Sequence, residues 1–275
     1  MNPLPFAISI PHGGWDVPPE FAPLVVATAA DQREDIDHLT REIFAQPEHT
    51  VAHQVVFDIA RTFVDLNRRP GDFGPGYTDG VVKSLTHIDA PIFSEFPSDE
   101  VVQAVLDQHF HPYHAGLAKA VADPEVVLLL DCHSMAPYGL SVSPDQPGKP
   151  RPLINLGHRG GATAPLWLVE CLQEIMAEVY DLPKSEISID HPFNGGYITS
   201  THGVGRVYAI QIEFNRAFYL GGEEGKVSPY LQPEVCQMWS ERFGRVLALL
   251  QERAFDSSQE LATLGTGLPT PVANN

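Results

Sequence analysis

Four apolar segments of the chain end on side chains that can bind a metal or move a proton. Two histidines and a carboxylate form the ligand set of a catalytic zinc, with the fourth position left for water. A glutamate inside an apolar run is costly unless it is paired or catalytic, which favours a functional role for Glu213. The four segments are FAISI (6–10) before His12, TFVDL (62–66) before Asn67 and Arg68, VVLLL (126–130) before Asp131 and His133, and VYAIQI (207–212) before Glu213.

Each of these groups taken alone has a structural interpretation. A single histidine after a strand is often a hydrogen-bonded structural residue, and an Asn-Arg pair is often a solvated surface turn. The combination is informative because the carboxyl ends of parallel strands meet at one edge of a sheet, where ligands bind. We therefore expect the four segment ends to form one site.

The HExxH spacing of helical zinc sites is absent, so the two histidines must come from different strand ends. The acidic metal ligand is expected in the segment DQREDIDHL. Asp35, Asp37 and His38 cluster there at the expected start of a helix. Carboxylates also favour the first turn of a helix, so capping is the alternative interpretation of both aspartates.

The elements that must position these groups alternate along the chain. Short runs rich in Val, Ile and Leu predict strands at 6–10, 62–66, 126–131, 152–157, 187–190 and 207–214. Helical spacing predicts helices at 35–45, 99–122, 164–180 and 233–254. This alternation is typical of an α/β protein with a largely parallel sheet covered by helices on both faces.

Local signals refine these elements. Ser98 is the expected N-cap of the second helix, and Pro112 is expected to kink it. Thr163 is the expected cap of the third helix. The glycine- and proline-rich segment 69–94 predicts a long surface loop. In an extended strand Asp131 points to the same side as His133, whereas Cys132 points away and is interpreted as a buried apolar residue.

Composition indicates a globular protein, with 43% hydrophobic and 19% charged residues. We expect a single domain over residues 1–255 and a flexible tail over 256–275. The net charge of -18 disfavours nucleic acid and anionic membranes as partners, so an anionic substrate needs a local positive pocket. Three widely spaced cysteines and the lack of a signal-peptide pattern or a long apolar run predict a cytoplasmic protein.

The ordered set PHGG, DLNR, DCHS and EFNR resembles the N-formylglutamate amidohydrolase family. The resemblance spans about residues 6–220 and includes PYH (112–114), NLG (155–157) and PFNGGYIT (192–199). It implies the three-layer αβα fold, with a mostly parallel mixed sheet, of zinc carboxypeptidases and aspartoacylase-like deacylases. It also implies one Zn²⁺ per chain and a small anionic N-acyl amino acid as substrate, in the setting of histidine breakdown.

The resemblance also implies roles for individual residues. His12 and His133 correspond to zinc ligands, and the acidic ligand falls on the segment DID, at Asp35 or, as the alternative, Asp37. Glu213 corresponds to the general base and Arg61 to the arginine that stabilises the carbonyl oxygen. The residues expected to contact the substrate are Asn67, Arg68, His158, Arg159, Asn194 and Tyr197.

The chain departs from the family pattern at two positions, and two other functions remain open. Asn194 stands where the family carries a lysine, and Ser200 where it carries an arginine, although His158 and Arg159 offer one positive charge in return. The departures bear on the substrate more than on the reaction. The alternatives are a small zinc carboxypeptidase and a binding protein for a metal or ligand without catalysis.

Overall fold

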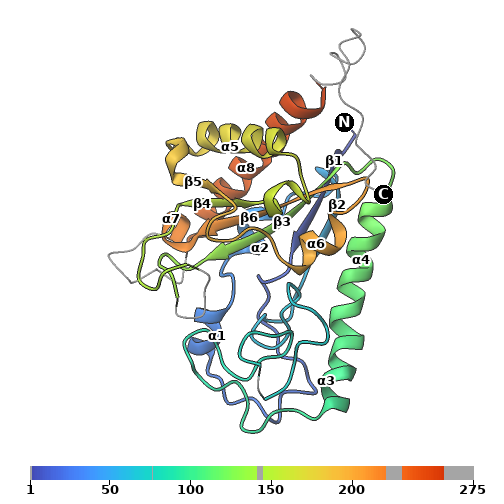
Figure 1. Ribbon diagram of the computed structural model, residues 1–275, viewed down its shortest axis with the longest axis vertical. Coiled ribbons are helices and arrows are strands. Elements are labelled where there is room, and N and C mark those ends of the chain that lie inside the picture. The colour runs from blue at the N-terminus through green and yellow to red at the C-terminus, as the bar shows by residue number, and fades with distance from the viewer. Residues whose placement is uncertain (1, 76, 141–144, 221–230, 257–275) are drawn as a thin grey trace.

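A six-stranded sheet in the order β2-β1-β3-β6-β4-β5 forms the centre of the protein (Figure 1). The computed structural model of the chain describes residues 2–75, 77–140, 145–220 and 231–256. All neighbouring strands are parallel except β4 and β6, which are antiparallel. The strands are β1 (Leu4–Ile10), β2 (Val51–Val56), β3 (Leu128–Met135), β4 (Ile154–Gly157), β5 (Ile187–Ile189) and β6 (Tyr208–Asn215).

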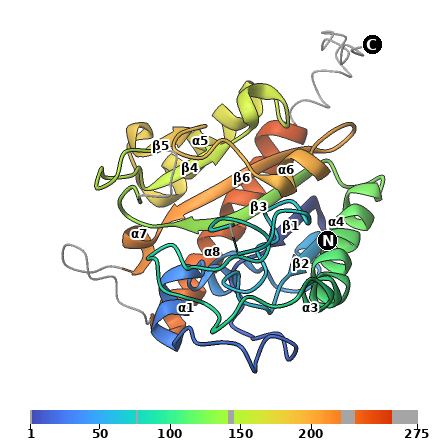
Figure 2. The same ribbon diagram turned by 60° about the horizontal axis from the view of Figure 1, so that its bottom comes forward.

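Helices cover both faces of this sheet, which confirms the expected α/β class with a mostly parallel mixed sheet. Helices α2, α5 and α8 pack on one face, and α3, α4 and α6 lie on the other (Figures 1 and 2). The helices are α1 (Ala29–Asp35), α2 (Thr40–Phe44), α3 (Asp99–Val105), α4 (His111–Ala122), α5 (Leu166–Tyr180), α6 (Tyr197–His202), α7 (Arg216–Leu220) and α8 (Pro233–Leu250). Shorter turns are the π-helical η1 (Leu106–Phe110) and η4 (Gln251–Asp256) and the 3-10 segments η2 (Arg159–Gly161) and η3 (Lys184–Glu186).

The central strand β3 shows how the sequence places polar groups on only one face. Every residue of LLLDCHSM is buried. Leu128, Leu130 and Cys132 point into the core formed with α5 and α8. Asp131 and His133 point to the opposite face, as the two-residue period of a strand requires. Cys132 is a fully buried member of the apolar core, as expected.

The predicted strand at 62–66 is wrong. The backbone N–H groups of Phe63 and Val64 both donate to the carbonyl oxygen of Ala60, which makes this segment a turn. Its apolar side chains fill the core under the long loop, and a short apolar run indicates burial without specifying the backbone. The sheet position is taken by β2, a half-buried edge strand whose His53 and Gln54 weaken the apolar pattern.

The predicted helix at 35–45 is also wrong as a single element. Helix α1 ends at Asp35, where Ile36 turns to an extended conformation (φ −81°, ψ 163°). Helix α2 begins only at Thr40, after Leu39 has adopted a positive φ of 61°. The break separates Asp35 from Asp37 and turns them toward different parts of the protein.

The other expected helices are present, with corrections at their ends. Ser98 is the N-cap of α3, as expected, whereas α5 begins after Pro165, so Thr163 does not cap it. Helix α3 continues through the π-helical turn η1 into α4, whose first turn contains Pro112. No helix in the described ranges is long and apolar enough to cross a membrane. The predicted tail beyond residue 256 lies outside the described residues.

Candidate metal and active site

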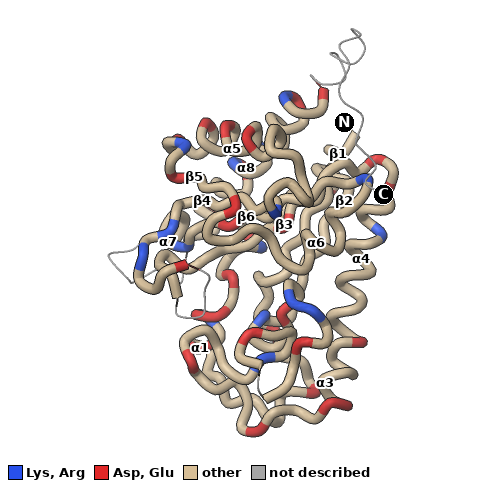
Figure 3. Tube along the Cα trace, in the orientation of Figure 1, with Lys and Arg blue, Asp and Glu red and all other residues tan. Residues whose placement is uncertain are grey.

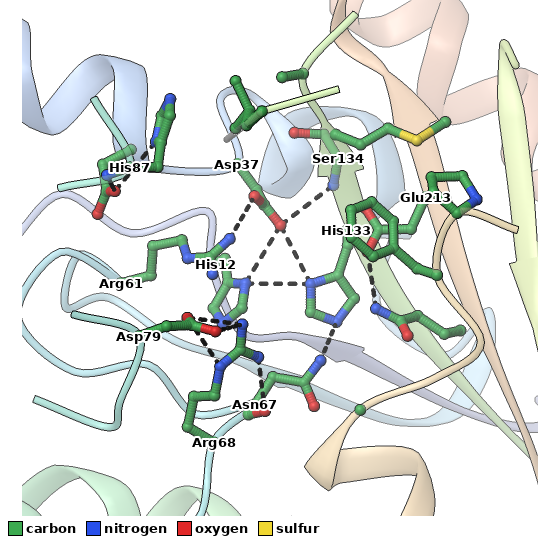
Figure 4. A pocket seen from close by; sticks show the side chains of 18 of the residues that line it. His12, Asp37, Arg61, Asn67, Arg68, Asp79, His87, His133, Ser134 and Glu213 are labelled. Atoms are coloured by element: carbon green, nitrogen blue, oxygen red, sulfur yellow. Dashed lines mark hydrogen bonds and ion pairs between the residues drawn. The ribbon is translucent and has the colours of Figure 1, made fainter. Parts of the chain in front are cut away.

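The three central strands bring three of the predicted residues to one end of the sheet. His12 follows β1, while His133 and Glu213 are directly paired in the register of β3 and β6. All three are buried. Figure 4 shows them around one pocket, with Glu213 beside His133.

Glycines after β1 let the chain turn closely enough to place His12. A Cβ atom on Gly14 would come within 2.2 Å of the carbonyl oxygen of Asp58, and one on Gly13 within 2.8 Å of the Thr40 side chain. A side chain at position 14 would therefore displace the backbone of Asp58, and one at position 13 would displace the Thr40 side chain. These close contacts explain why glycines follow His12 in the PHGG sequence.

Asp37 is the aspartate that joins the two histidines. Its backbone N–H donates to the carbonyl oxygen of His12, which ties the break between α1 and α2 to the end of β1. Asp35 instead lies against the long loop, where its carboxylate pairs with Lys83 at 2.8 Å and accepts from the backbone N–H of His87 at 3.0 Å. Both aspartates line the pocket, but only Asp37 lies beside His12 and His133.

Three acceptor atoms converge at this point. The Nδ1 atoms of His12 and His133 lie 3.1 Å apart, and Asp37 Oδ2 lies 3.3 Å from the first and 3.2 Å from the second. Dashed lines in Figure 4 mark this triangle. All three residues are nearly inaccessible to solvent, at 1–3% exposure.

Carboxylates on the far side of each ring set the tautomers. His12 Nε2 lies 2.9 Å from Asp65 Oδ1, and His133 Nε2 lies 2.9 Å from Asp131 Oδ2. A carboxylate only accepts, so each Nε2 carries a proton. The Nδ1 atoms of both rings therefore face the triangle, where each offers a lone pair to a metal ion once its own proton has left. Carboxylates that orient histidine ligands in this way are typical of zinc sites.

The donor set fits a zinc ion. Nitrogen and oxygen ligands of a tetrahedral zinc lie about 3.3 Å from one another, close to the spacing of the three acceptors. Two histidines and one carboxylate leave the fourth position open. The residues present therefore suit a catalytic rather than a fully enclosed structural site.

Electrostatics also favour a positive charge in the triangle. Burial opposes ionisation of Asp37, but hydrogen bonds with His12 and His133 and the charge of Arg61 hold the pKa of this carboxyl well below its usual range. Burial opposes protonation of His133, but Asp131 and Asp37 hold the pKa of this ring well above its usual value. The triangle thus favours a positive charge, which a proton on His133 supplies in the metal-free protein and a metal ion would supply in its place.

Glu213 has the environment of a proton acceptor. Burial raises the pKa of its carboxyl to about 8, while the neighbouring His133 acts in the opposite direction. Gln211, two residues earlier on the same face of β6, donates from Nε2 to Glu213 Oε1 at 2.8 Å. A carboxylate with a pKa near neutrality can take a proton and return it.

Arg61 links the cluster to its supporting carboxylates. Its guanidinium contacts Asp65 at 2.6 Å and Asp37 at 3.4 Å, and its side chain is 20% exposed. Burial opposes its charge, but Asp65 and Asp37 raise the pKa of Arg61 further above its usual range. A permanent cation therefore faces the pocket beside the metal cluster.

Asn67 and Arg68 lie next to each other but have different surroundings. The Asn67 side chain fits against Gly196, accepts from the backbone N–H of Ile198 at 2.9 Å, and approaches His133 Nε2 at 3.5 Å. The guanidinium of Arg68 binds the carboxylate of Asp79. Both line the pocket, to which Asn67 contributes an amide group and Arg68 a guanidinium group.

The pocket has a volume of about 390 Å³, which suits a small molecule. Among the residues that the structure describes, five permanent cations line it: Arg61, Arg68, Lys83, Arg151 and Arg216. They match five lining carboxylates, Asp35, Asp37, Asp79, Asp190 and Glu213, so a bound dication would make the pocket positive. Acidic residues meanwhile mark the outer helices α1, α3 and α5 (Figure 3).

The structure brings only part of the expected substrate-binding set to the pocket. Asn194 lines it together with Asn67 and Arg68, whereas His158, Arg159 and Tyr197 are not among the lining residues. His158 is buried between Asp190 and the carbonyl oxygen of Ala164. Arg159 is exposed, and the ring of Tyr197 packs on His114. Arg159 lies against Gly195, which does line the pocket.

Several residues of the site had no role assigned from the sequence, among them Gln211, Asp65, Lys83 and Asp79. Asp65 supports His12 and belongs to the DLNR motif, so its carboxylate two positions before Asn67 was an available signal. Lys83 and Asp79 lie in the glycine- and proline-rich loop, where no periodic pattern indicates which side chains turn inward.

Comparisons with known proteins place the chain in a family and identify proteins of similar fold. A family model described as N-formylglutamate amidohydrolase matches residues 4–220. An N-formylglutamate amidohydrolase from Ralstonia eutropha JMP134 is similar in structure, with a TM-score of 0.72 and 23% identity over 92% of this chain and 94% of that one. A gene product of Agrobacterium tumefaciens has a TM-score of 0.56 and 16% identity over 90% and 92% of the two chains. None of the curated proteins matches.

Proposed function

Since the chain belongs to the N-formylglutamate amidohydrolase family, we propose that it is a zinc-dependent amidohydrolase that cleaves the formyl or another acyl amide of an N-acyl amino acid such as N-formyl-L-glutamate. The observation that carries the proposal is the convergence of His12, Asp37 and His133, each within hydrogen-bonding distance of the others. We also propose a role in histidine breakdown, which the family resemblance implies, and a cytoplasmic location, which the cysteine usage and the lack of a signal-peptide pattern predict.

The metal and the base have separate tasks. His12, Asp37 and His133 would hold the zinc, which supplies Lewis acidity and a bound water of lowered pKa. Glu213 accepts the proton of the attacking water and passes it to the departing amine. Its partner Gln211 holds one carboxylate oxygen and leaves the other for this transfer.

Cationic side chains bind the substrate and stabilise the reacting carbonyl. Arg61 faces the pocket beside Asp37, where its charge stabilises the negative oxygen that develops during attack. Loss of one such donor costs about 2.7–4 kcal/mol in well-studied enzymes. Arg68 is a planar fork that matches a carboxylate with two hydrogen bonds, and so orients the amide.

The test combines metal analysis with a substrate screen. The purified protein is expected to contain about one zinc per chain and to release formate from N-formyl amino acids, with glutamate tried first. Glu213→Gln keeps the shape of the side chain and is expected to retain zinc but lose about 10²–10⁴-fold in kcat. Unchanged turnover in this variant would exclude Glu213 as the base.

Two further outcomes would contradict the proposal in different ways. Release of C-terminal amino acids from peptides, without formate from N-formyl substrates, would identify a carboxypeptidase. If the zinc-loaded protein hydrolyses neither peptides nor N-formyl substrates, the chain would be a binding protein without catalysis.

A further inference from the structure

The guanidinium of Arg68 is already bound to a carboxylate of the chain itself. Asp79 Oδ1 accepts from Nε at 3.1 Å and from the terminal NH2 nitrogen at 2.9 Å, and Oδ2 accepts from the same terminal nitrogen at 3.1 Å. Figure 4 shows the two side chains facing each other at the edge of the pocket. An external carboxylate would use the same Nε and NH2 donors of this fork.

The Arg68–Asp79 pair is the most exposed of the ion pairs made by pocket-lining lysines and arginines of the described chain. The Asp79 side chain is 56% exposed and that of Arg68 is 32% exposed. The carboxylates that pair with Arg61, Lys83 and Arg151 are at most 7% exposed. An exposed pair contributes little stability, whereas opening a buried pair leaves an uncompensated charge. An incoming anion therefore displaces Asp79 more easily than any of the other carboxylates.

The surrounding backbone does not depend on this pair. The loop that carries Asp79 is anchored by the backbone N–H of Val81, which donates to the carbonyl oxygen of Asp72 at 2.7 Å. Gly80 packs directly against that carbonyl group. Arg68 has its own anchor, because its NH1 nitrogen donates to the carbonyl oxygen of Asn67 at 3.1 Å. Both partners therefore keep their positions when the carboxylate of Asp79 leaves.

We propose that Asp79 is a specificity-determining residue, whose carboxylate occupies the place on Arg68 that the substrate carboxylate takes in the complex. The inference rests on the proposed function, since it assigns Arg68 to the substrate carboxylate. Binding is then an exchange in which Asp79 turns to solvent as the substrate enters. A ligand with no carboxylate gains nothing from Arg68, because its entry leaves the internal pair intact.

The exchange has a measurable cost in affinity. When the internal pair is closed in most molecules, the apparent dissociation constant is raised by the inverse of the open fraction. For an exposed ion pair this factor is about fivefold. Removing the charge of Asp79 while keeping its shape should recover that factor.

The experiment is calorimetric titration of the zinc-loaded protein with L-glutamate, which requires no turnover. We expect Asp79→Asn to lower the dissociation constant about fivefold. Asp89→Asn removes the same charge from an exposed position of the same loop outside the pocket lining, and should change nothing. In an Arg68→Gln background, Asp79→Asn should have no effect, which separates competition for Arg68 from a general charge effect.

Three results would overturn the inference: unchanged or weaker binding by Asp79→Asn, equal tightening in the Arg68→Gln background, or no binding of glutamate to any variant. These results are independent of the formate-release assay. If the protein hydrolyses N-formyl amino acids but Asp79→Asn does not tighten glutamate binding, only the displacement of Asp79 by the substrate is refuted. If Asp79→Asn tightens glutamate binding but no hydrolysis is found, only the proposed reaction is refuted.

Discussion

The Nδ1 atoms of His12 and His133 lie 3.1 Å apart, with the Nε2 atom of each ring directed at a different buried carboxylate. Two ring nitrogens approach this closely when a proton or a metal cation lies between them. The geometry predicts that zinc stabilises the fold. At free zinc about 1,000 times the dissociation constant, the free energy of unfolding should rise by about 4 kcal/mol over that of the chelated protein.

His133→Ala is the variant that tests this stabilisation. It removes one of three ligands, so thermal unfolding with and without zinc should coincide. A variant that kept the full zinc-dependent shift would remove His133 from the site.

Substitution of the two aspartates of the DID segment should have opposite effects on zinc binding and on stability. Asp37→Asn should weaken zinc binding by more than about 100-fold, because a ligand is lost rather than a residue that orients one. Asp35→Asn should leave zinc binding of the folded protein intact but destabilise it by about 3–5 kcal/mol, because Lys83 loses its buried counter-charge. Elemental analysis and chemical denaturation measure the two effects, and the reverse pattern would make Asp35 the ligand.

The ionisation of Glu213 predicts a pH dependence of stability in the metal-free protein. Burial raises the pKa of its carboxyl from the ordinary 4.5 to about 8, so the folded state holds a proton that the unfolded chain releases between these values. The free energy of unfolding should therefore fall as pH rises from about 4.5 to 8, by roughly 2–5 kcal/mol relative to Glu213→Gln. Parallel pH profiles of wild type and variant would contradict this assignment.

Arg68→Lys should raise KM for carboxylate-bearing substrates about tenfold with a small change in kcat, because a point charge replaces a fork that makes two hydrogen bonds. Arg69→Lys is the matched control, since Arg69 is exposed and does not line the pocket. Steady-state kinetics with N-formyl-L-glutamate measures both. An equal effect in the two variants would indicate a general charge effect.

His114 predicts a second pH dependence, with a separate origin. Burial, together with the adjacent His202, lowers the pKa of its ring from 6.5 to about 4. Its Nε2 lies 3.0 Å from the carbonyl oxygen of Leu66, directly before Asn67. As pH falls from 6.5 to 4 the unfolded chain takes up the proton first, so His114 should cost the fold up to about 3 kcal/mol.

Denaturation of His114→Gln and of His111→Gln at pH 7 and pH 4 tests this. His111 lies on the same helix with a 48% exposed side chain and is the matched control. We expect only His114→Gln to reduce the loss of stability on acidification. An equal reduction in both variants would point to helix charge rather than to the buried ring.

Much of the site could be predicted because strong local signals coincide with it. The runs before His12, His133 and Glu213 are apolar and become the three central strands, where burial on both faces leaves few other interpretations. The run before Asn67 has the same composition but forms a turn, because its burial comes from loop packing rather than from the sheet. Local pattern does not separate these two kinds of burial.

The sequence alone determined that β1, β3 and β6 are strands and which reactive groups stand at their ends, since both depend on short-range order along the chain. Only the tertiary structure decided that Asp37 rather than Asp35 faces the histidines, because the choice depends on Ile36 leaving the helix and on a hydrogen bond to the end of β1. It alone also paired Arg68 with Asp79, whose approach depends on how the long loop returns over the pocket. Contacts between distant segments are decided by packing, which no local pattern encodes.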